Sequence, residues 1–261
     1  MAIYPNYITF ALMIKLNPKY KNYAIILENI PDIFEQQGRV IYDKRNKIKV
    51  IEANDGKPLC VKRYHPPRGI NLFVYSWGIR KPKGLRAFTY PEMLLSKGIG
   101  TPEPMAYIEQ RRYGLLRHSY LITEMSPLQH TMYEVGNAKE GEYERLAKAF
   151  GEFAAKMHNN GVLHLDFSPG NILWDVDQEG YHFELVDINR MEFRDEISLK
   201  EGCKNLCRLW GPKRFFMLLV AHYAAARGLD AVECQVVALK ARRKFWKKYG
   251  KKHEIEFKLE L

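Results

Sequence analysis

Four polar residues in the second half of this 261-residue chain have the types and spacing needed for phosphoryl transfer. His164, Asp166 and Asn171 form the pattern H-x-D-x4-N, and Asp187 ends an apolar stretch that begins at residue 183. In a phosphotransferase, such a loop supplies an aspartate that accepts the proton of the acceptor hydroxyl and an asparagine that holds a metal. A second aspartate after an apolar strand carries Mg²⁺. The pattern therefore predicts a catalytic loop followed by a metal-binding loop.

The residues around this loop indicate the elements that position it. Residues 142–160 predict an amphipathic helix, because large apolar side chains recur there at helical spacing. Pro169 and Gly170 predict a turn that brings the polar side chains of the loop to one pocket. Segments 171–174 and 182–186 then predict a β-hairpin that leads into the second aspartate.

The first half of the chain has the alternating pattern of an antiparallel sheet. Residues 38–42, 48–52 and 59–64 predict three consecutive strands, separated by short polar turns. Lys62 lies late in the third strand, where a phosphotransferase of this kind keeps the lysine that pairs the α- and β-phosphates of a nucleotide. A strand lysine that only faces solvent would look the same in the sequence.

The turn between the first two strands is basic and contains no glycine. A glycine-rich loop would let backbone N–H groups approach the phosphates, whereas this turn carries Lys44, Arg45 and Lys47. Either these side chains contact the phosphates, or the turn is merely solvated.

Composition limits the classes of protein and of partner. The chain is 46% hydrophobic with a net charge of +11, and no apolar run reaches the ~18 residues of a membrane span. The beginning of the chain lacks the pattern of a signal peptide, and four scattered cysteines indicate reduced thiols in a cytosolic protein. Residues 240–253 hold eight Lys and Arg and no acid. Charge alone does not choose between nucleic acid, anionic lipid and phosphorylated ligands.

We expect three segments along the chain. Residues 1–12 are predicted to be an N-terminal extension, disordered or a misassigned start, because Met13 would itself begin a normal protein. Residues 13–124 are predicted to form a small nucleotide-binding lobe, with an irregular segment over 65–84 and a helix that ends near Gly98. Residues 125–261 are predicted to form a mainly helical lobe with the catalytic and metal-binding loops and the acceptor site.

This order of elements resembles the protein-kinase-like fold across nearly the whole chain. In detail it is similar to the lipopolysaccharide kinase family, which phosphorylates Kdo or heptose sugars of the lipopolysaccharide inner core. The strings that carry the resemblance are Val61-Lys62-Arg63-Tyr64, residues 97–104, residues 164–171 and residues 186–190. The resemblance implies an α+β, two-lobed fold with a small antiparallel-sheet N-lobe and a mainly helical C-lobe.

The resemblance also implies roles for individual residues and for ligands. Lys62 would position the phosphates of ATP, Asp166 would be the catalytic base, and Asn171 and Asp187 would hold Mg²⁺. His164 would brace the loop. The acceptor would be a hydroxyl of a lipopolysaccharide core sugar, and no nucleic acid partner is expected.

The sequence departs from the kinase pattern at two positions. Protein kinases pair the strand lysine with a helix glutamate, and alignment of the helix on Gly98 puts Ala87 there, with Glu92 the nearest acid. We therefore predict that, without nucleotide, Lys62 has no glutamate partner and reaches toward Asp187. Leu165 stands where protein kinases have an arginine, so no switch through a phosphorylated activation loop is expected.

Two other functions fit the same motifs. A small-molecule kinase of the aminoglycoside or choline type uses a similar loop, and an acid-lined acceptor pocket would favour it because its substrates are cationic. A pseudokinase would keep the fold as a binding module without turnover. The expected location is the cytoplasm, either free or at the inner face of the membrane. Residues 240–253 would make the membrane contact. Alternatively, they form a solvated helix that only covers the large lobe.

Overall fold

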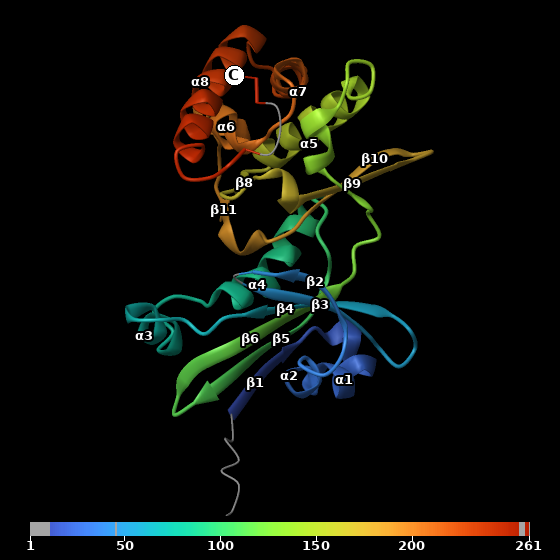
Figure 1. Ribbon diagram of the computed structural model, residues 1–261, viewed down its shortest axis with the longest axis vertical. Helices are drawn as coiled ribbons and strands as arrows, with labels where there is room; N and C mark the ends of the chain where they lie inside the picture. Colours follow the sequence, from blue (N-terminus) through green and yellow to red (C-terminus); the bar gives the residue numbers. More distant parts are fainter. Residues whose placement is uncertain (1–10, 45, 256–258, 261) are drawn as a thin grey trace, which may run out of the picture. The chain divides into compact units, whose positions relative to one another are not determined.

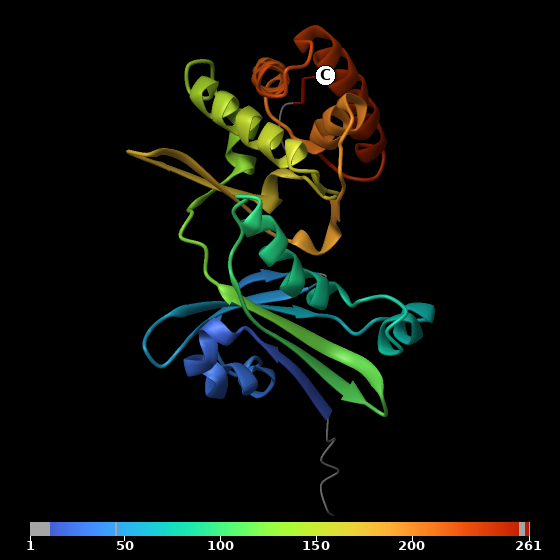
Figure 2. The same ribbon diagram turned by 180° about the vertical axis from the view of Figure 1, so that it is seen from behind.

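The structure is a computed structural model that describes residues 11–44, 46–255 and 259–260. These residues fold into two compact units (Figures 1 and 2). The first unit comprises the described residues of Met1–Pro91 together with Pro102–Met125. The second comprises Glu92–Thr101 and the described residues of Ser126–Leu261. The expected lobe boundary after Glu124 lies next to the observed one, but residues 92–101 group with the second unit.

The first unit is built on one antiparallel sheet of six strands in the order β1-β5-β6-β4-β3-β2. Its elements are β1 (Ala11–Leu16), η1 (Pro18–Tyr23), α1 (Ala24–Glu28), α2 (Ile30–Ile33), β2 (Arg39–Asp43), β3 (Lys47–Glu52), β4 (Pro58–Tyr64), α3 (Ile70–Ser76), the first part of α4 (Lys83–Ser96), β5 (Pro104–Arg112) and β6 (Leu115–Glu124).

The two faces of this sheet are covered by different helices. On one face, Leu27 of α1 and Ile30 of α2 pack with Val61 of β4 in a continuous buried cluster. On the other face, α4 approaches so closely that a Cβ at Gly84 would lie 2.5 Å from the ring of Tyr107. Successive strand residues point to opposite faces of the sheet. Each face buries its own set of side chains, and this fixes the register of the strands.

The second unit contains the remaining helices and two small sheets. Its elements are the end of α4, β7 (His130–Thr131), η2 (Met132–Asn137), α5 (Glu144–Asn159), β8 (Val162–His164), η3 (Pro169–Asn171), β9 (Ile172–Asp177), β10 (Gly180–Leu185), η4 (Ile188–Arg190), β11 (Met191–Phe193), α6 (Leu199–Asn205), η5 (Leu206–Arg208), α7 (Lys213–Ala226) and α8 (Ala231–Tyr249). Strands β10, β9 and β7 form one sheet, and β11 pairs with β8.

Helix α5 is the centre of the second unit. Leu146, Phe150 and Met157 are buried along one of its faces, as the helical spacing predicts. Gly151 lets α7 approach, because a Cβ there would lie 2.6 Å from a backbone oxygen of α7. Gly161 ends the helix with φ +70° and directs the chain into β8. The helix thereby fixes the start of the predicted catalytic loop.

One local prediction was wrong, and one strand was not predicted. Residues 65–84 are not irregular throughout, since α3 forms within them and α4 begins at Lys83. Before the first strands of the predicted sheet, the chain forms the two short helices α1 and α2, and Pro31 lies in the first turn of α2, where its missing N–H costs nothing. Strand β1 was not expected, and it starts within the predicted extension. Ala11 pairs with Arg111 of β5, and residues 1–10 of that extension lie outside the described residues.

Candidate active site

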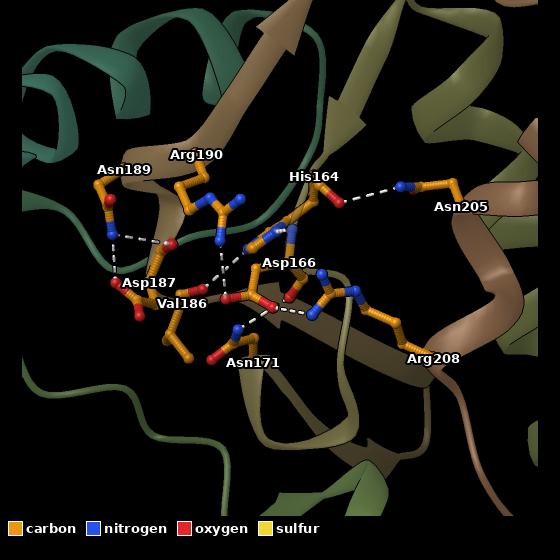
Figure 3. Close-up of polar contacts among 9 residues, drawn as sticks. All are labelled: His164, Asp166, Asn171, Val186, Asp187, Asn189, Arg190, Asn205 and Arg208. Atoms are coloured by element: carbon orange, nitrogen blue, oxygen red, sulfur yellow. Dashed lines mark hydrogen bonds and ion pairs between the residues drawn. The ribbon is translucent and has the colours of Figure 1, made fainter. Parts of the chain in front are cut away.

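His164 connects the two predicted loops through both of its ring nitrogens. It ends β8 and is completely buried. Its Nδ1 accepts a hydrogen bond from the backbone N–H of Asp166 at 3.1 Å, so Nε2 carries the proton and donates it to the carbonyl oxygen of Val186, also at 3.1 Å. Burial lowers the pKa of His164, which favours the neutral imidazole that these two bonds require. The side chain thus braces the catalytic loop against the metal-binding loop (Figure 3).

Asn171 ties the far end of the catalytic loop to its aspartate. The side-chain Nδ2 of Asn171 donates to the backbone oxygen of Asp166 at 2.9 Å. The backbone oxygen of Asn171 accepts from the N–H of Val186 at 3.0 Å, which places the residue beside the end of β10. With its amide nitrogen engaged in this way, Asn171 has its Oδ1 left to act as a ligand.

Asp187 has a left-handed backbone conformation, with φ 54° and ψ 39°. Outside glycine this conformation is found mainly for Asn and Asp, and it is enriched at functional loops. Its Oδ1 accepts a hydrogen bond from Asn189 Nδ2 at 2.5 Å. Asn189 therefore orients the Asp187 carboxylate in this structure.

The oxygen atoms of Asn171 and Asp187 form a donor set that fits Mg²⁺. Mg²⁺ prefers oxygen ligands, and in phosphoryl transfer it takes one or two protein ligands together with water and substrate phosphates. In the described part of the chain, no three His, Cys, Asp or Glu side chains cluster to bind a metal. The site therefore suits a metal that arrives with a nucleotide.

Aromatic packing and a glycine fix the body of the catalytic loop. Phe167 is buried, with its ring centroid 5.7 Å from that of Phe150 on α5. A Cβ at Gly170 would lie 2.4 Å from the ring of Tyr133, so the turn requires glycine while that ring stays in place. The contact with Tyr133 explains why glycine stands at position 170 of the loop.

Two arginines that the sequence analysis did not assign to the site contact Asp166. Arg208 Nη1 donates to Asp166 Oδ1 at 2.5 Å, and Arg190 Nη1 lies 3.8 Å from Asp166 Oδ2. Asn205 Nδ2 donates to the backbone oxygen of His164 at 3.0 Å (Figure 3). Arg190 lay within a string that carried the family resemblance, whereas nothing in the spacing of Asn205 and Arg208 indicated them.

Lys62 belongs to the other unit. It lies on β4, paired with Leu121 of β6, and its Nζ is 5.3 Å from the centroid of the Tyr64 ring. Ala87 is buried on α4, and the part of α4 that belongs to the first unit contains no acid. Glu92 is exposed and groups with the second unit. A contact between Lys62 and either Glu92 or Asp187 would join two units, so the expectation for Lys62 stays a prediction.

The basic turn between β2 and β3 was expected either to contact phosphates or to be solvated. Lys44 is exposed, and Lys47 forms an ion pair of 3.3 Å with Asp43. Arg45 lies outside the described residues. Direct contact of this turn with phosphates stays a prediction.

Comparison with known proteins identifies the family. The sequence matches the lipopolysaccharide kinase (Kdo/WaaP) family over residues 36–227, well over half of the chain. The chain belongs to this family. It is therefore a phosphotransferase, as the motifs predicted, and a lipopolysaccharide kinase. The match covers β2 to β6 and every residue of the catalytic and metal-binding loops. None of the curated proteins compared matches the sequence significantly.

Comparison with solved structures tests the fold. The structure "WaaP in complex with acyl carrier protein" aligns with a TM-score of 0.60 and 17% sequence identity, covering 93% of this chain and 100% of that one. The Rio2 kinase from Chaetomium thermophilum, in a complex with ADP, Mg²⁺ and phosphoaspartate, aligns with a TM-score of 0.49 and 16% identity over 85% of this chain and 75% of that one. The predicted two-lobed, α+β protein-kinase-like fold is confirmed by the likeness to WaaP.

The sequence contains no apolar run long enough to span a membrane, and the helices of the structure were compared with this expectation. Among the described residues, none of the helices combines the length and apolar character required to cross a bilayer.

Proposed function

We propose that this lipopolysaccharide kinase transfers the γ-phosphoryl group of ATP to a hydroxyl of an inner-core sugar, Kdo or heptose. In this proposal Asp166 is the catalytic base, Asn171 and Asp187 are the Mg²⁺ ligands, and Lys62 positions the α- and β-phosphates. The observation that carries it is the continuous set of hydrogen bonds that joins Asp166 to Asn171 directly and to Val186, the residue before Asp187, through His164.

The reaction needs positioning more than covalent chemistry from the protein. The acceptor oxygen attacks the γ-phosphorus as the bond to the bridging oxygen of ADP breaks, and the hydroxyl proton passes to the Asp166 carboxylate. When bound, Mg²⁺ neutralises the charge that develops on the phosphate oxygens. The protein's contribution is to keep the base and the two ligand-bearing residues in a fixed relation, which their shared hydrogen bonds provide.

The two rival functions predict different products. An aminoglycoside or choline kinase would phosphorylate cationic acceptors, whereas a pseudokinase would bind nucleotide without turnover. Incubation of the full chain with ATP, Mg²⁺ and separate panels of core sugars, aminoglycosides and choline, followed by mass spectrometry, distinguishes them. A phosphate added only to a core sugar supports the proposal. A phosphate added only to a cationic acceptor, or to none, contradicts it.

We further infer that α8 places the enzyme at an anionic membrane surface in the cytoplasm, where ATP is available. Its buried residues Cys234, Ala238 and Trp246 face α6 and α7. A stripe of exposed cations at helical spacing occupies another face, and we call it the basic stripe. It comprises Lys240, Arg243, Lys244, Lys247 and Lys248, and the exposed Lys251 follows just after the helix ends. Such a stripe suits anionic lipid headgroups, although a solvated helix that only covers the unit would carry similar charges.

A further inference from the structure

The two carboxylate oxygens of Asp166 have different surroundings. Oδ1 accepts the short hydrogen bond from Arg208, whereas Arg190 lies 3.8 Å from Oδ2, beyond the range of a hydrogen bond. The two guanidinium groups approach the carboxylate from different sides (Figure 3). Oδ1 is therefore engaged, and Oδ2 is the oxygen with capacity for the proton of an acceptor hydroxyl.

Arg208 is held so that it can fix the base. Its guanidinium carbon lies 5.2 Å from the centroid of the Phe245 ring on α8, in a cation–π contact. Its short helix η5 follows Asn205, which bonds to His158 and to the backbone of His164. Arg208 is thus supported from both α8 and the catalytic loop. We assign it as a positioning residue for Asp166.

Arg190 lies close to Asp166 but forms no hydrogen bond with its carboxylate. The side chain is 53% exposed, and within the described part of the chain Asp166 is the one carboxylate that it contacts. Its backbone oxygen accepts a hydrogen bond from the N–H of Leu165 at 2.8 Å, which ties its position to the catalytic loop. Two guanidinium groups face the Asp166 carboxylate here, so the positive charge of Arg190 lies beside the oxygen that receives the proton.

We propose that Arg190 recognises an anionic group, a carboxylate or a phosphate, that the acceptor sugar carries next to the hydroxyl that is phosphorylated. A guanidinium presents paired N–H donors that match both kinds of anion. An anion bound there holds the hydroxyl at Asp166 Oδ2, so the same contact gives selectivity and orientation. This inference rests on the proposed function, because it names the class of sugar that the enzyme accepts.

The experiment compares matched acceptors that differ only in the anionic group. One pair is a Kdo-containing acceptor and its carboxyl-reduced form, and the other is a heptose acceptor with and without a neighbouring phosphate. Steady-state kcat and KM are measured for each acceptor with the wild type, Arg190→Gln and Arg190→Lys. Arg194→Gln is the matched control, since Arg194 lies four residues away and, in the described chain, its side chain forms ion pairs only with the surface carboxylates Glu192 and Glu201.

We expect the wild type to prefer the anionic member of one pair, and that pair identifies the anion. Arg190→Gln should lower kcat/KM for the anionic member by about 10- to 100-fold, mainly through KM, because a hydrogen bond to a charged group is lost. The neutral member should lose clearly less, because for it the variant removes only the ion pair between Arg190 and Asp166. Arg190→Lys should recover part of the loss, and Arg194→Gln should behave as wild type.

Two results would overturn the assignment of Arg190. The wild type could use both members of each pair equally well, or Arg190→Gln could reduce kcat/KM for both members by the same factor. A wild type that phosphorylates none of the four acceptors would instead overturn the proposed function itself, whatever the role of Arg190.

Discussion

The side-chain amide of Asn171 donates its hydrogen bond to the backbone carbonyl oxygen of Asp166 over 2.9 Å. The proposed metal ligand and the proposed base are therefore mechanically linked within one loop. His164 and Val186 connect that loop to the segment that carries Asp187 through further hydrogen bonds. A substitution that breaks the hydrogen bond between Asn171 and Asp166 should therefore affect the proposed base as well as the proposed metal ligand.

The first prediction tests that linkage at Asn171. Asn171→Asp keeps an oxygen that can bind Mg²⁺ but replaces the amide donor with a carboxylate, which would face the carbonyl oxygen of Asp166. We expect kcat to fall by about 10-fold or more, since a half-buried carbonyl oxygen loses its hydrogen-bond donor and faces a negative charge instead. Mg²⁺-dependent binding of ATP, measured by calorimetry, should persist. Wild-type kcat in this variant would show that the hydrogen bond does not position the base.

The second prediction concerns the glycine that leads from α5 into β8. Gly161 has φ +70°, and a Cβ there would lie 1.8 Å from the backbone oxygen of Arg194. Gly228 follows α7 with φ +66° and open space around it. Gly228→Ala should lower the free energy of unfolding by about 1 kcal/mol, the cost of a left-handed backbone for alanine. Gly161→Ala should lower it by about 3 kcal/mol or more, because the added methyl group also clashes.

Chemical denaturation of both glycine variants measures this difference in the free energy of unfolding. Because the backbone conformations match, the excess loss at Gly161 isolates the clash with Arg194. Equal losses in the two variants would mean that the chain at Arg194 moves away without cost, and that the start of the catalytic loop is not fixed there.

Local patterns in the sequence were sufficient for the elements but not for the whole site. The spacing of Leu146, Phe150 and Met157 predicted α5, because a helix buries one face at a fixed period. Strand β1 was missed because its partner β5 lies about ninety residues away, and no local pattern reports such pairing. Arg208 was missed for the same reason, since it reaches Asp166 from 42 positions along the chain.

The third prediction is a loss of stability in mild acid. Burial lowers the pKa of His158 from 6.5 to about 4, and His158 bonds to Tyr223 and Asn205. Between these two pH values the unfolded chain binds the proton more readily than the folded one, so the free energy of unfolding falls as pH falls. The full loss of unfolding free energy from this group is on the order of 3 kcal/mol, and it is reached below about pH 4.

Denaturation of the wild type and of His158→Gln across pH 7 to 4 tests this effect. The variant cannot titrate at this position, so its stability should depend less steeply on pH, while His253→Gln at the surface should follow the wild type. Burial also lowers the pKa of His164, so part of the slope should persist in the variant. Identical slopes in wild type and His158→Gln would contradict the account.

The fourth prediction concerns the basic stripe on α8. Replacing Lys244, Lys247 and Lys248 with Gln should weaken binding to anionic vesicles by on the order of 100-fold, because each lysine near a charged membrane contributes about 1 kcal/mol. The control replaces three exposed cations elsewhere in the same unit, with the same change in net charge. These are Lys139, Arg145 and Lys148.

Flotation with anionic and with neutral vesicles at two salt concentrations provides the measurement for the stripe. The wild type should float with anionic vesicles only, and less at high salt, because salt screens the attraction. Equal flotation with both kinds of vesicle, or an equal effect of the control triple variant, would remove the proposed membrane role.

The central claim is that Asp166 serves the acceptor and Asp187 serves the metal, and one paired measurement tests it. Asp166→Asn and Asp187→Asn are nearly isosteric, so both should fold. Mg²⁺-dependent ATP binding and phosphoryl transfer to a core sugar are measured for each. We expect Asp166→Asn to bind Mg²⁺–ATP within a few-fold of wild type and to lose transfer, because its role is to orient and deprotonate the hydroxyl. Asp187→Asn should lose both, because in the proposed mechanism Asp187 would hold the Mg²⁺ that accompanies the nucleotide. Retained transfer in Asp166→Asn, or Mg²⁺–ATP binding unchanged in Asp187→Asn, would contradict the account.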